Sequence, residues 1–266
     1  MFTGYSRPLP GTPVNHTHPL SRGLISHWLL GDGGAREQDI SLARNHGTLQ
    51  SFDGVPVVGG PDGGRALSFD GSARYIQTTN NYGNASSLTT CTLFAWFKTT
   101  TISKLIMGLN QSQDGSHSTT DRSLQIDSSG RLLIYIFDTG VKTAFSPGSV
   151  TDDKWHLGVG VVTTTGISLY LDGVLRAFST TTAAYTGYSS SYWVIGKGVP
   201  GGVQYFNGLI SRCGIYNRAL SAGEVALLYA EPYAGFVEDF RDYVAPSASL
   251  GGYQRYYSTH IGGMGG

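Results

Sequence analysis

The sequence predicts an all-β protein built as a two-sheet antiparallel sandwich, and three features of the 266-residue chain support this. Only 14% of the residues are charged, against about 25% in an average domain, and the 38 glycines are roughly twice the usual share. Short runs rich in β-branched and aromatic residues recur between clusters of Gly, Asp and Ser. These runs do not alternate with helical segments, which argues against a βαβ architecture.

The apolar runs predict about ten to twelve strands. Asp127-Ser128-Ser129-Gly130 separates two of them as a short hairpin loop, and Asp172-Gly173 suits the positive φ angles of a type I′ turn. The predicted strands cover residues 24–30, 66–77, 90–98, 103–109, 123–126, 131–137, 155–163, 166–171, 174–179, 192–197 and 204–216.

One short helix is predicted after the strands, ending before Pro232. Ser221 and Glu224 have the spacing of a capping box, in which each side chain satisfies a free backbone N–H of the first turn. Val225 and Leu228 give the helix an apolar side.

The predicted strand at 92–98 has apolar residues on both faces. Leu93 and Phe97 lie on one face, and Phe94 and Trp96 lie on the other. A strand of a two-layer sandwich normally shows one face to water. Either the C-terminal tail or a partner covers the second face, or that face is a ligand platform, and coverage is the favoured interpretation.

Both ends of the chain differ from its centre. Residues 1–21 contain four prolines and predict an extended arm, whereas the Gly- and Tyr-rich tail at 231–266 cannot build a core of its own. The expected domain therefore spans residues 22–230. The N-terminus lacks the apolar stretch of a secretory signal, and no run of about 18 apolar residues occurs, so we expect synthesis in the cytosol and no membrane span.

The formal net charge is zero, from 18 basic and 18 acidic residues. Nucleic-acid phosphates and anionic membranes both favour basic proteins, so neither partner is expected. A neutral protein is poorly protected against self-association, which makes a homo-oligomer plausible.

Catalytic signatures are missing from the sequence. No E-x-D-x-x-E strand or G-x-S-x-G turn occurs, and the acidic pair Glu238-Asp239 lies in the tail. Cys91 and Cys213 lie in separate predicted strands; buried free thiols are expected, and one long-range disulfide is the alternative. The prediction is a protein that is not an enzyme.

Two loops are candidate recognition surfaces: one combines aromatic and small polar residues, and the other is long and polar. They lie after residue 109 and before residue 193. The candidate ligand-binding residues are Tyr185, Tyr188, Tyr192, Asn110, Asp114 and His117.

Seven segments, in order along the chain, resemble one family. They are His27-Trp28-Leu29-Leu30-Gly31-Asp32-Gly33-Gly34, Asp39 through Asn45-His46-Gly47-Thr48-Leu49, Ala66-Leu67-Ser68-Phe69-Asp70-Gly71 with Arg74-Tyr75-Ile76, Thr92-Leu93-Phe94-Ala95-Trp96-Phe97-Lys98, Trp155-His156, Leu169-Tyr170-Leu171-Asp172-Gly173, and Phe206-Asn207-Gly208-Leu209-Ile210 with Ile215-Tyr216-Asn217-Arg218-Ala219-Leu220-Ser221. Together they resemble the laminin-G-like (concanavalin A-like) jelly-roll family over about residues 22–230.

The resemblance implies a two-sheet jelly roll that binds carbohydrate or protein more often than it catalyses. Some members bind a structural Ca²⁺, for which Asp32 and Asp70 are the candidate oxygen ligands here. The family's usual acidic pair after "G-x-I" is replaced by Ser211-Arg212, and an arginine would repel a cation. No cofactor is therefore expected, and calcium is disfavoured.

The segment at 228–236 is similar to the ending of such domains in phage-encoded virion proteins. The main functional hypothesis is a virion structural protein, a capsid decoration or fibre-type subunit, whose arms contact other virion proteins and which touches surface glycans. The alternatives are a carbohydrate-binding adhesin or lectin module and, third, a glycan-cleaving enzyme.

Overall fold

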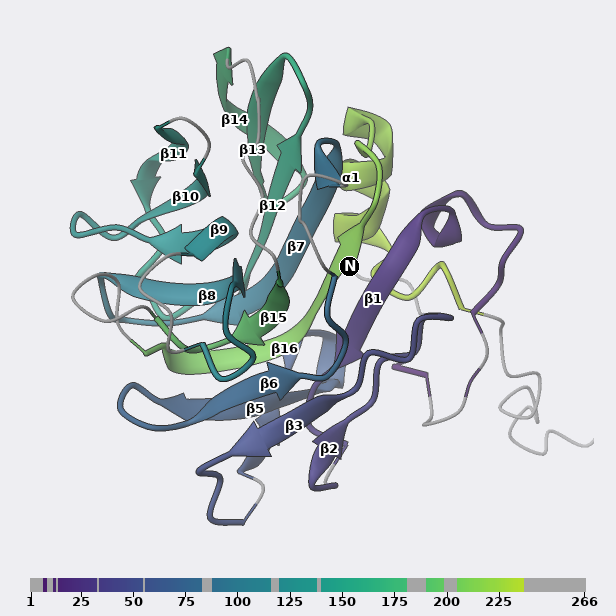
Figure 1. Ribbon diagram of the computed structural model, residues 1–266, viewed down its shortest axis with the longest axis vertical. Helices are drawn as coiled ribbons and strands as arrows, with labels where there is room; N and C mark the ends of the chain where they lie inside the picture. The colour runs from purple at the N-terminus through teal and green to yellow at the C-terminus, as the bar shows by residue number, and fades with distance from the viewer. Residues whose placement is uncertain are drawn as a thin grey trace, which may run out of the picture.

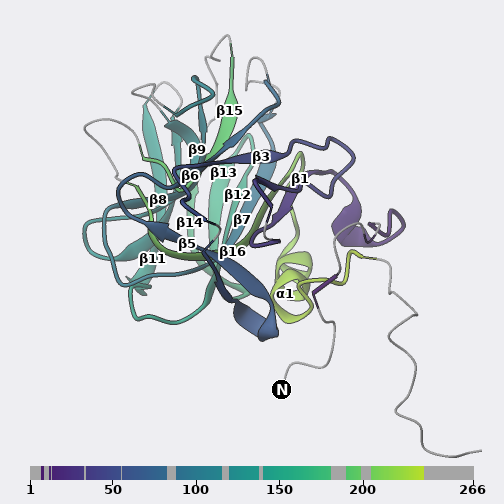
Figure 2. The ribbon, with the colours of Figure 1, turned by 90° about the horizontal axis from the view of Figure 1, so that it is seen from below.

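The computed structural model describes residues 7–8, 12, 14–32, 34–54, 56–82, 88–115, 120–137, 140–180, 190–198 and 205–236. Within them the chain forms two antiparallel sheets of eight strands each, which confirms the predicted sandwich (Figure 1, Figure 2). The two sheets are named sheet 1 and sheet 2 below.

Sheet 1 has the order β14-β13-β12-β7-β16-β5-β4, and β1 also pairs with β16. Its strands are β1 (Leu24–Leu29), β4 (Val57–Gly59), β5 (Arg65–Asp70), β7 (Cys91–Lys98), β12 (His156–Val162), β13 (Gly166–Leu171), β14 (Val174–Thr180) and β16 (Asn207–Tyr216).

Sheet 2 has the order β11-β10-β9-β8-β15-β6-β3-β2. Its strands are β2 (Arg36–Glu37), β3 (Gly47–Gln50), β6 (Tyr75–Thr78), β8 (Lys104–Asn110), β9 (Thr120–Ile126), β10 (Arg131–Phe137), β11 (Val141–Ser149) and β15 (Tyr192–Ile195). The sequence did not predict β2, β3, β4 and β11. Short strands such as β2 and β4 carry too few residues to show an alternating pattern.

The expected strand at 66–77 is in fact two strands, which belong to different sheets. The break follows from Asp70, whose Oδ1 accepts the backbone N–H groups of Ser72, Ala73 and Arg74 at 2.9, 2.9 and 3.1 Å. Gly71 adopts a φ of 76°, which a glycine tolerates without strain. At the predicted hairpin, Asp172 and Gly173 both have positive φ, 53° and 79°, as a type I′ turn requires.

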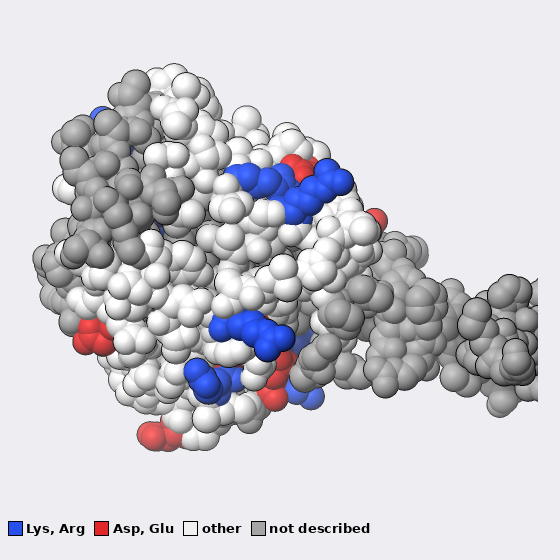
Figure 3. Space-filling view, turned by 45° about the vertical axis from the view of Figure 1, so that its right-hand side comes forward, with Lys and Arg blue, Asp and Glu red and all other residues white. Residues whose placement is uncertain are grey.

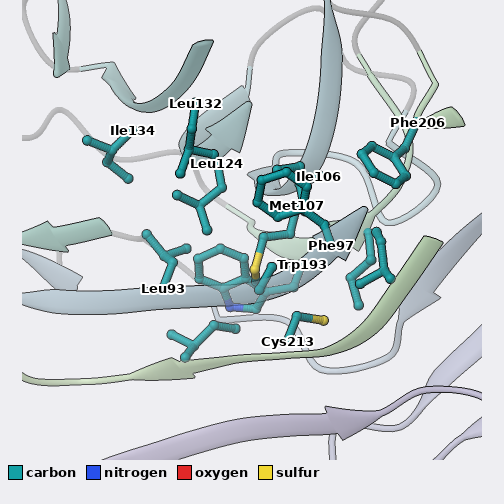
Figure 4. Packing of buried hydrophobic residues seen from close by; sticks show 14 of the residues in the cluster. Leu93, Phe97, Ile106, Met107, Leu124, Leu132, Ile134, Trp193, Phe206 and Cys213 are labelled. Carbon is teal, nitrogen blue, oxygen red and sulfur yellow. The ribbon is translucent and has the colours of Figure 1, made fainter. Parts of the chain in front are cut away.

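The main core lies between the sheets. In Figure 4, Leu93 and Phe97 of β7 face Leu124, Leu132 and Ile134 of sheet 2 across the interior. All five are fully buried. Each such side chain stabilises the fold by about 1.5–3 kcal/mol relative to exposure, which makes this layer the dominant favourable contribution.

The outer face of β7 is covered by the chain itself. Phe94 and Trp96 pack in a second apolar cluster with Val225 and Leu228 of helix α1 (Ala222–Ala230). The indole ring of Trp96 stacks on Tyr229 with centroids 5.5 Å apart. Figures 1 and 2 both show α1 beside β7 and β16. The second face of β7 is covered, as expected, but the expected cover was the C-terminal tail or a partner, whereas within the described residues the cover is mainly this helix.

The predicted capping box is present at the start of α1. The Ser221 hydroxyl accepts the Glu224 N–H at 3.3 Å, and the Glu224 carboxylate accepts the Ser221 N–H at 2.9 Å. Arg218 holds the same carboxylate at 2.7 Å. The helix is therefore fixed at the position where it covers Trp96.

The described parts of the two terminal segments pair with each other. Val14 forms an isolated bridge with Phe236, and the Asn15 N–H donates to the Gly235 carbonyl at 2.8 Å. The 3-10 helix η1 (Pro19–Ser21) adds Leu20 to the cluster under α1. Packed structure thus extends beyond the expected 22–230 at both ends, while the remainder of the tail, with Glu238-Asp239, lies outside the described residues.

In a second 3-10 turn, η2 (Pro61–Gly63), the chain returns into β5.

Cys91 and Cys213 are both buried free thiols. Cys213 pairs across the sheet with Ala95, four residues along β7 from Cys91. Four residues of strand correspond to roughly 13 Å, which exceeds the Cα separation that a disulfide spans. Burial raises the pKa of Cys91 to about 11, so its thiol stays protonated at neutral pH. The expectation of two buried thiols is confirmed.

Among the described residues, none of the helices has the length and apolar character needed to cross a membrane.

Candidate ligand-binding site

Three of the six predicted ligand-binding residues lie at one end of sheet 2. Asn110 is the last residue of β8 and pairs directly with Tyr192, the first residue of β15. Asp114 lies in the loop that follows β8 and is exposed. Tyr185, Tyr188 and His117 fall outside the described residues.

The loop after β8 is held against the neighbouring strands. Gln113 donates from Nε2 to the carbonyl of Thr78 at 3.1 Å, and the Ser190 hydroxyl donates to the carbonyl of Gln111 at 2.9 Å. Asn110 is buried, and its Oδ1 accepts the Ser112 N–H at 2.9 Å. The amide of Asn110 thus shapes the loop, and Asp114 is the member of the predicted set that this loop presents to solvent.

A pair of tyrosines, which the sequence analysis did not single out, lies beside this loop. The rings of Tyr75 and Tyr205 meet edge to face with centroids 6.2 Å apart. The Lys197 ammonium lies 4.5 Å from the centroid of Tyr75 and 6.0 Å from that of Tyr205, and it donates to the Asp114 carbonyl oxygen. Tyr75, Tyr205, Lys197 and Asp114 are called the tyrosine–lysine cluster below.

Nearby charges affect the pKa of both tyrosine hydroxyls. Burial, then the Asp114 carboxylate, raise the pKa of both Tyr75 and Tyr205, and Asp70 adds to the effect at Tyr205. Both hydroxyls therefore remain protonated donors across the neutral range. Because both rings are only half-buried, the cluster presents aromatic surface and hydrogen-bonding groups together.

The structure does not bring the two candidate calcium ligands together. Asp32 accepts a charged hydrogen bond from Arg7 at 2.7 Å, and the same guanidinium donates to the Arg65 carbonyl at the start of β5. Asp70 is the last residue of β5, roughly 17 Å further along. Its Oδ1 is held by the backbone of the following turn: burial opposes ionisation, but these hydrogen bonds outweigh it and hold the pKa of Asp70 well below its usual range.

The residues that replace the family's acidic pair have structural contacts. The Ser211 hydroxyl donates to the Arg65 carbonyl at 2.8 Å. The Arg212 guanidinium is buried between the rings of Trp96 and Tyr233, at 4.9 and 4.6 Å from their centroids. Within the part of the chain that the structure describes, no three His, Cys, Asp or Glu side chains are grouped so that they could hold a metal ion.

Three titratable groups outside the cluster, Glu37, Asp121 and His156, have structural surroundings. Burial raises the pKa of Glu37 to about 7, and burial also raises the pKa of Asp121; both side chains are inaccessible to a surface ligand. His156 bridges the Asp172 and Asp152 carboxylates at 2.9 and 3.0 Å and so joins the β13–β14 turn to the loop before β12. These contacts give His156 a structural role.

The chain belongs to the concanavalin A-like lectin/glucanases superfamily, because that family's model matches residues 70–226, more than half of the chain. A comparison with curated protein sequences finds no match.

Solved structures with the same fold come from several proteins. Domain 4 of AbnA, an extracellular arabinanase from Geobacillus stearothermophilus solved with arabinotriose, superposes with a TM-score of 0.60 at 15% identity, over 77% of this chain and 98% of that domain. The binding domain of botulinum neurotoxin DC, solved with SialylT, gives 0.57 at 11% identity over 79% of this chain and 52% of that one. Trypanosoma rangeli sialidase, solved with the inhibitor DANA, gives 0.57 at 17% identity over 80% and 34%. The chain thus spans about half of the neurotoxin chain and a third of the sialidase, and at these identities the likeness concerns the fold.

Proposed function

We propose that this chain is a lectin-like carbohydrate-binding domain and that the tyrosine–lysine cluster is its ligand contact. The observation that carries the proposal is the edge-to-face pair of Tyr75 and Tyr205, half-buried beside an ammonium and an exposed carboxylate. Sugar rings have apolar C–H faces that pack on aromatic rings and hydroxyls that need hydrogen-bonding partners. The cluster offers both kinds of contact in one place.

The comparisons support a carbohydrate ligand at the level of the fold. The arabinanase domain was solved with arabinotriose, and the neurotoxin binding domain with SialylT. The proposed role is binding without catalysis, since glycoside hydrolysis needs two accessible carboxyl groups about 5–10 Å apart. Glu37 and Asp121, the described carboxyl groups whose pKa is raised, are both buried.

The charge distribution is compatible with a neutral binding surface. On the face shown in Figure 3, basic and acidic side chains occur in small groups, and most of the surface is uncharged. The formal net charge of the whole chain is zero. Such a surface favours recognition through shape and hydrogen bonds over long-range electrostatic attraction.

Glycan-array binding followed by isothermal titration calorimetry tests the proposal. The variant Tyr205→Ala should lower the affinity of the best array ligand at least tenfold, because ring stacking and a hydroxyl donor are both lost. Phe178→Ala is the matched control: it removes an exposed aromatic ring from β14, on the other sheet. Equal loss in both variants, or no loss in Tyr205→Ala, would show that the ligand binds elsewhere.

A role as a virion structural subunit is the second proposal, and the paired terminal segments favour it. The Val14–Phe236 bridge holds both terminal segments at one place on the domain, from which they could act together on a neighbouring subunit. This proposal implies a homo-oligomer, other virion proteins as partners and location in the virion. Light scattering of the full chain beside a 14–236 fragment tests it, since assembly by the full chain alone is expected.

A further inference from the structure

We infer that the ligand is a linear oligosaccharide bound along its length, which extends from the tyrosine–lysine cluster over a polar strip on the outer face of sheet 2. The polar strip consists of Thr48 and Gln50 of β3 and Gln77 of β6. This inference rests on the proposed function of the cluster, to which it adds a second contact region and the form of the ligand. Its evidence is the strand register, the burial of the neighbouring residues and a set of unused hydrogen-bonding groups.

The strand register places the polar strip directly beside Tyr75. Tyr75 and Gln77 point to the same side of β6, because residues two apart on a strand share a face, and Ile76 between them is fully buried in the core. In the pairing of β6 with β3, Gln50 lies opposite Tyr75, and Thr48 lies opposite Gln77. Figure 1 shows the two strands side by side. Tyr75 and the polar strip therefore form one surface, about 7 Å long along the strands and about 5 Å from strand to strand.

The loop after β8 bounds this surface on one side. On β15, Val194 lies opposite Gln77 and shares its face of the sheet, yet only 1% of Val194 is exposed. The cover is Gly115 of the loop, which packs so closely that a Cβ atom there would lie 3.3 Å from Val194 and 3.2 Å from Lys197. The outer face of sheet 2 is thus closed over β15, whereas it is open over β6 and β3, and the loop forms a wall along that boundary.

The hydrogen-bonding groups of the polar strip are not used by the protein. Thr48, Gln50 and Gln77 are half-exposed, and within the described part of the chain none of the three side chains makes a hydrogen bond. By contrast, Gln125 on the same face of the sheet is buried and donates to the Ser123 hydroxyl at 2.7 Å. An amide side chain offers donors and an acceptor together, and a sugar hydroxyl can use both. The polar strip can therefore bind sugar hydroxyls without breaking a contact within the protein.

The spacing of these groups favours a chain of sugar units over a single terminal sugar. Tyr75 and Thr48 are diagonal neighbours in the sheet, a relation that separates residues by about 7–8 Å. One sugar ring is about as wide as a tyrosine ring, so a ring stacked on Tyr75 leaves Thr48 to the next unit of the chain. An unbranched chain suits the open sheet face, because a branch directed at the strands would lift the chain away from them.

Calorimetric titration of the full chain with arabino-, xylo- and cello-oligosaccharides of increasing length tests the inference. In a series that binds, the affinity should rise at least fivefold from the disaccharide to the tetrasaccharide, since the net contribution of one neutral hydrogen bond corresponds to about fivefold in affinity. Gln77→Ala should lower the affinity for the tetrasaccharide about fivefold, and more than it lowers that for the disaccharide.

A pair of threonine variants provides the matched control. Thr48→Ala should reduce the gain of affinity with chain length, as Gln77→Ala does. Thr143→Ala should not, because Thr143 is a half-exposed threonine on the same face of sheet 2 but lies on β11, far from β3 in the strand order. Thermal unfolding of all three variants checks that they remain folded.

The outcomes distinguish the polar strip from the proposed site itself. If the affinity does not change with chain length while Tyr205→Ala still lowers it, the polar strip is wrong and the tyrosine–lysine cluster stands. Equal losses in Thr48→Ala and Thr143→Ala would also overturn the strip. If no series binds, or if Tyr205→Ala binds as tightly as wild type, the proposed site is wrong and the strip fails with it.

Discussion

The burial of His27 predicts that acid destabilises the folded protein. The residue lies on β1, and its ring packs against Phe94 and Phe236 at centroid distances of 5.1 and 5.8 Å. It borders a cavity of about 10 Å³, enough for one water molecule, whose lining includes Val14 and Tyr216. Burial, with smaller contributions from Arg212 and Arg7, lowers the pKa of His27 from 6.5 to about 3. The folded protein therefore keeps this imidazole neutral where an unfolded chain would protonate it.

The sign and size of the effect follow from linkage. Between pH 6.5 and about 3 the unfolded chain holds one more proton at this position than the folded protein, so the free energy of unfolding falls as the pH falls. A shift of about 3.5 pKa units corresponds to about 5 kcal/mol in total. Of this, about 2 kcal/mol should be lost by pH 5, which is a large part of the stability of a typical domain.

Urea unfolding at several pH values, followed by tryptophan fluorescence, measures this effect. The informative quantity is the difference in unfolding free energy between wild type and His27→Gln, since glutamine does not titrate. Between pH 7 and pH 5, the unfolding free energy of wild type should fall by about 2 kcal/mol more than that of His27→Gln. His16→Gln, which removes an exposed histidine of the N-terminal segment, is the control variant. A difference for His27→Gln that stays constant from pH 7 to pH 4 would refute the reasoning.

Three further predictions concern stability. Burial raises the pKa of Glu37 from 4.5 to about 7, so its carboxyl contributes stability below pH 4.5 that is lost as the pH rises to 7. In urea titrations, the unfolding free energy of Glu37→Gln should therefore rise by about 3 kcal/mol relative to wild type over that range. Burial opposes protonation of His156, but Asp172 and Asp152 outweigh burial and raise the pKa of His156. The stability that His156 contributes is therefore complete below pH 6.5 and is lost as the pH rises through the pKa of the folded protein. In thermal melts, His156→Gln should lower the stability more at pH 6 than at pH 9. Ser221→Ala removes the cap of α1 and should cost about 1 kcal/mol in denaturant unfolding at pH 7, whereas an unchanged midpoint would show that packing alone holds the helix.

Local sequence signals predicted those parts of the fold that local physics decides. The Asp172-Gly173 turn and the Ser221 capping box depend on residues a few positions apart, and both are present. The two apolar faces of β7 followed from strand alternation. The element that covers the Phe94–Trp96 face could not be identified in this way, because α1 reaches β7 through tertiary packing of segments more than 120 residues apart.

The tyrosine–lysine cluster depends on pairing between distant strands, which is why the sequence analysis found only part of it. The register of β15 with β6 places Lys197, two residues after Ile195, beside Tyr75 at the start of β6. The loop after β8 starts at the other end of β15 and reaches Lys197, whose ammonium donates to the Asp114 carbonyl oxygen. Tyr205 joins them because it precedes β16, in the other sheet. In the sequence these four residues lie in four separate segments, and only Asp114 belonged to a stretch that composition marked as a recognition loop.

The segments that carry the family resemblance serve the scaffold. The Asp39 carboxylate, near the second matching segment, accepts the N–H groups of His27, Ser41 and Asn45 at 2.8–2.9 Å. The Asn45 carbonyl in turn accepts the Trp28 indole N–H at 2.7 Å. Such buried networks are costly to break, because each unpaired polar group would remain buried. In the proposed function, the scaffold residues therefore position the ligand contact, and the surface residues of the tyrosine–lysine cluster would decide the specificity.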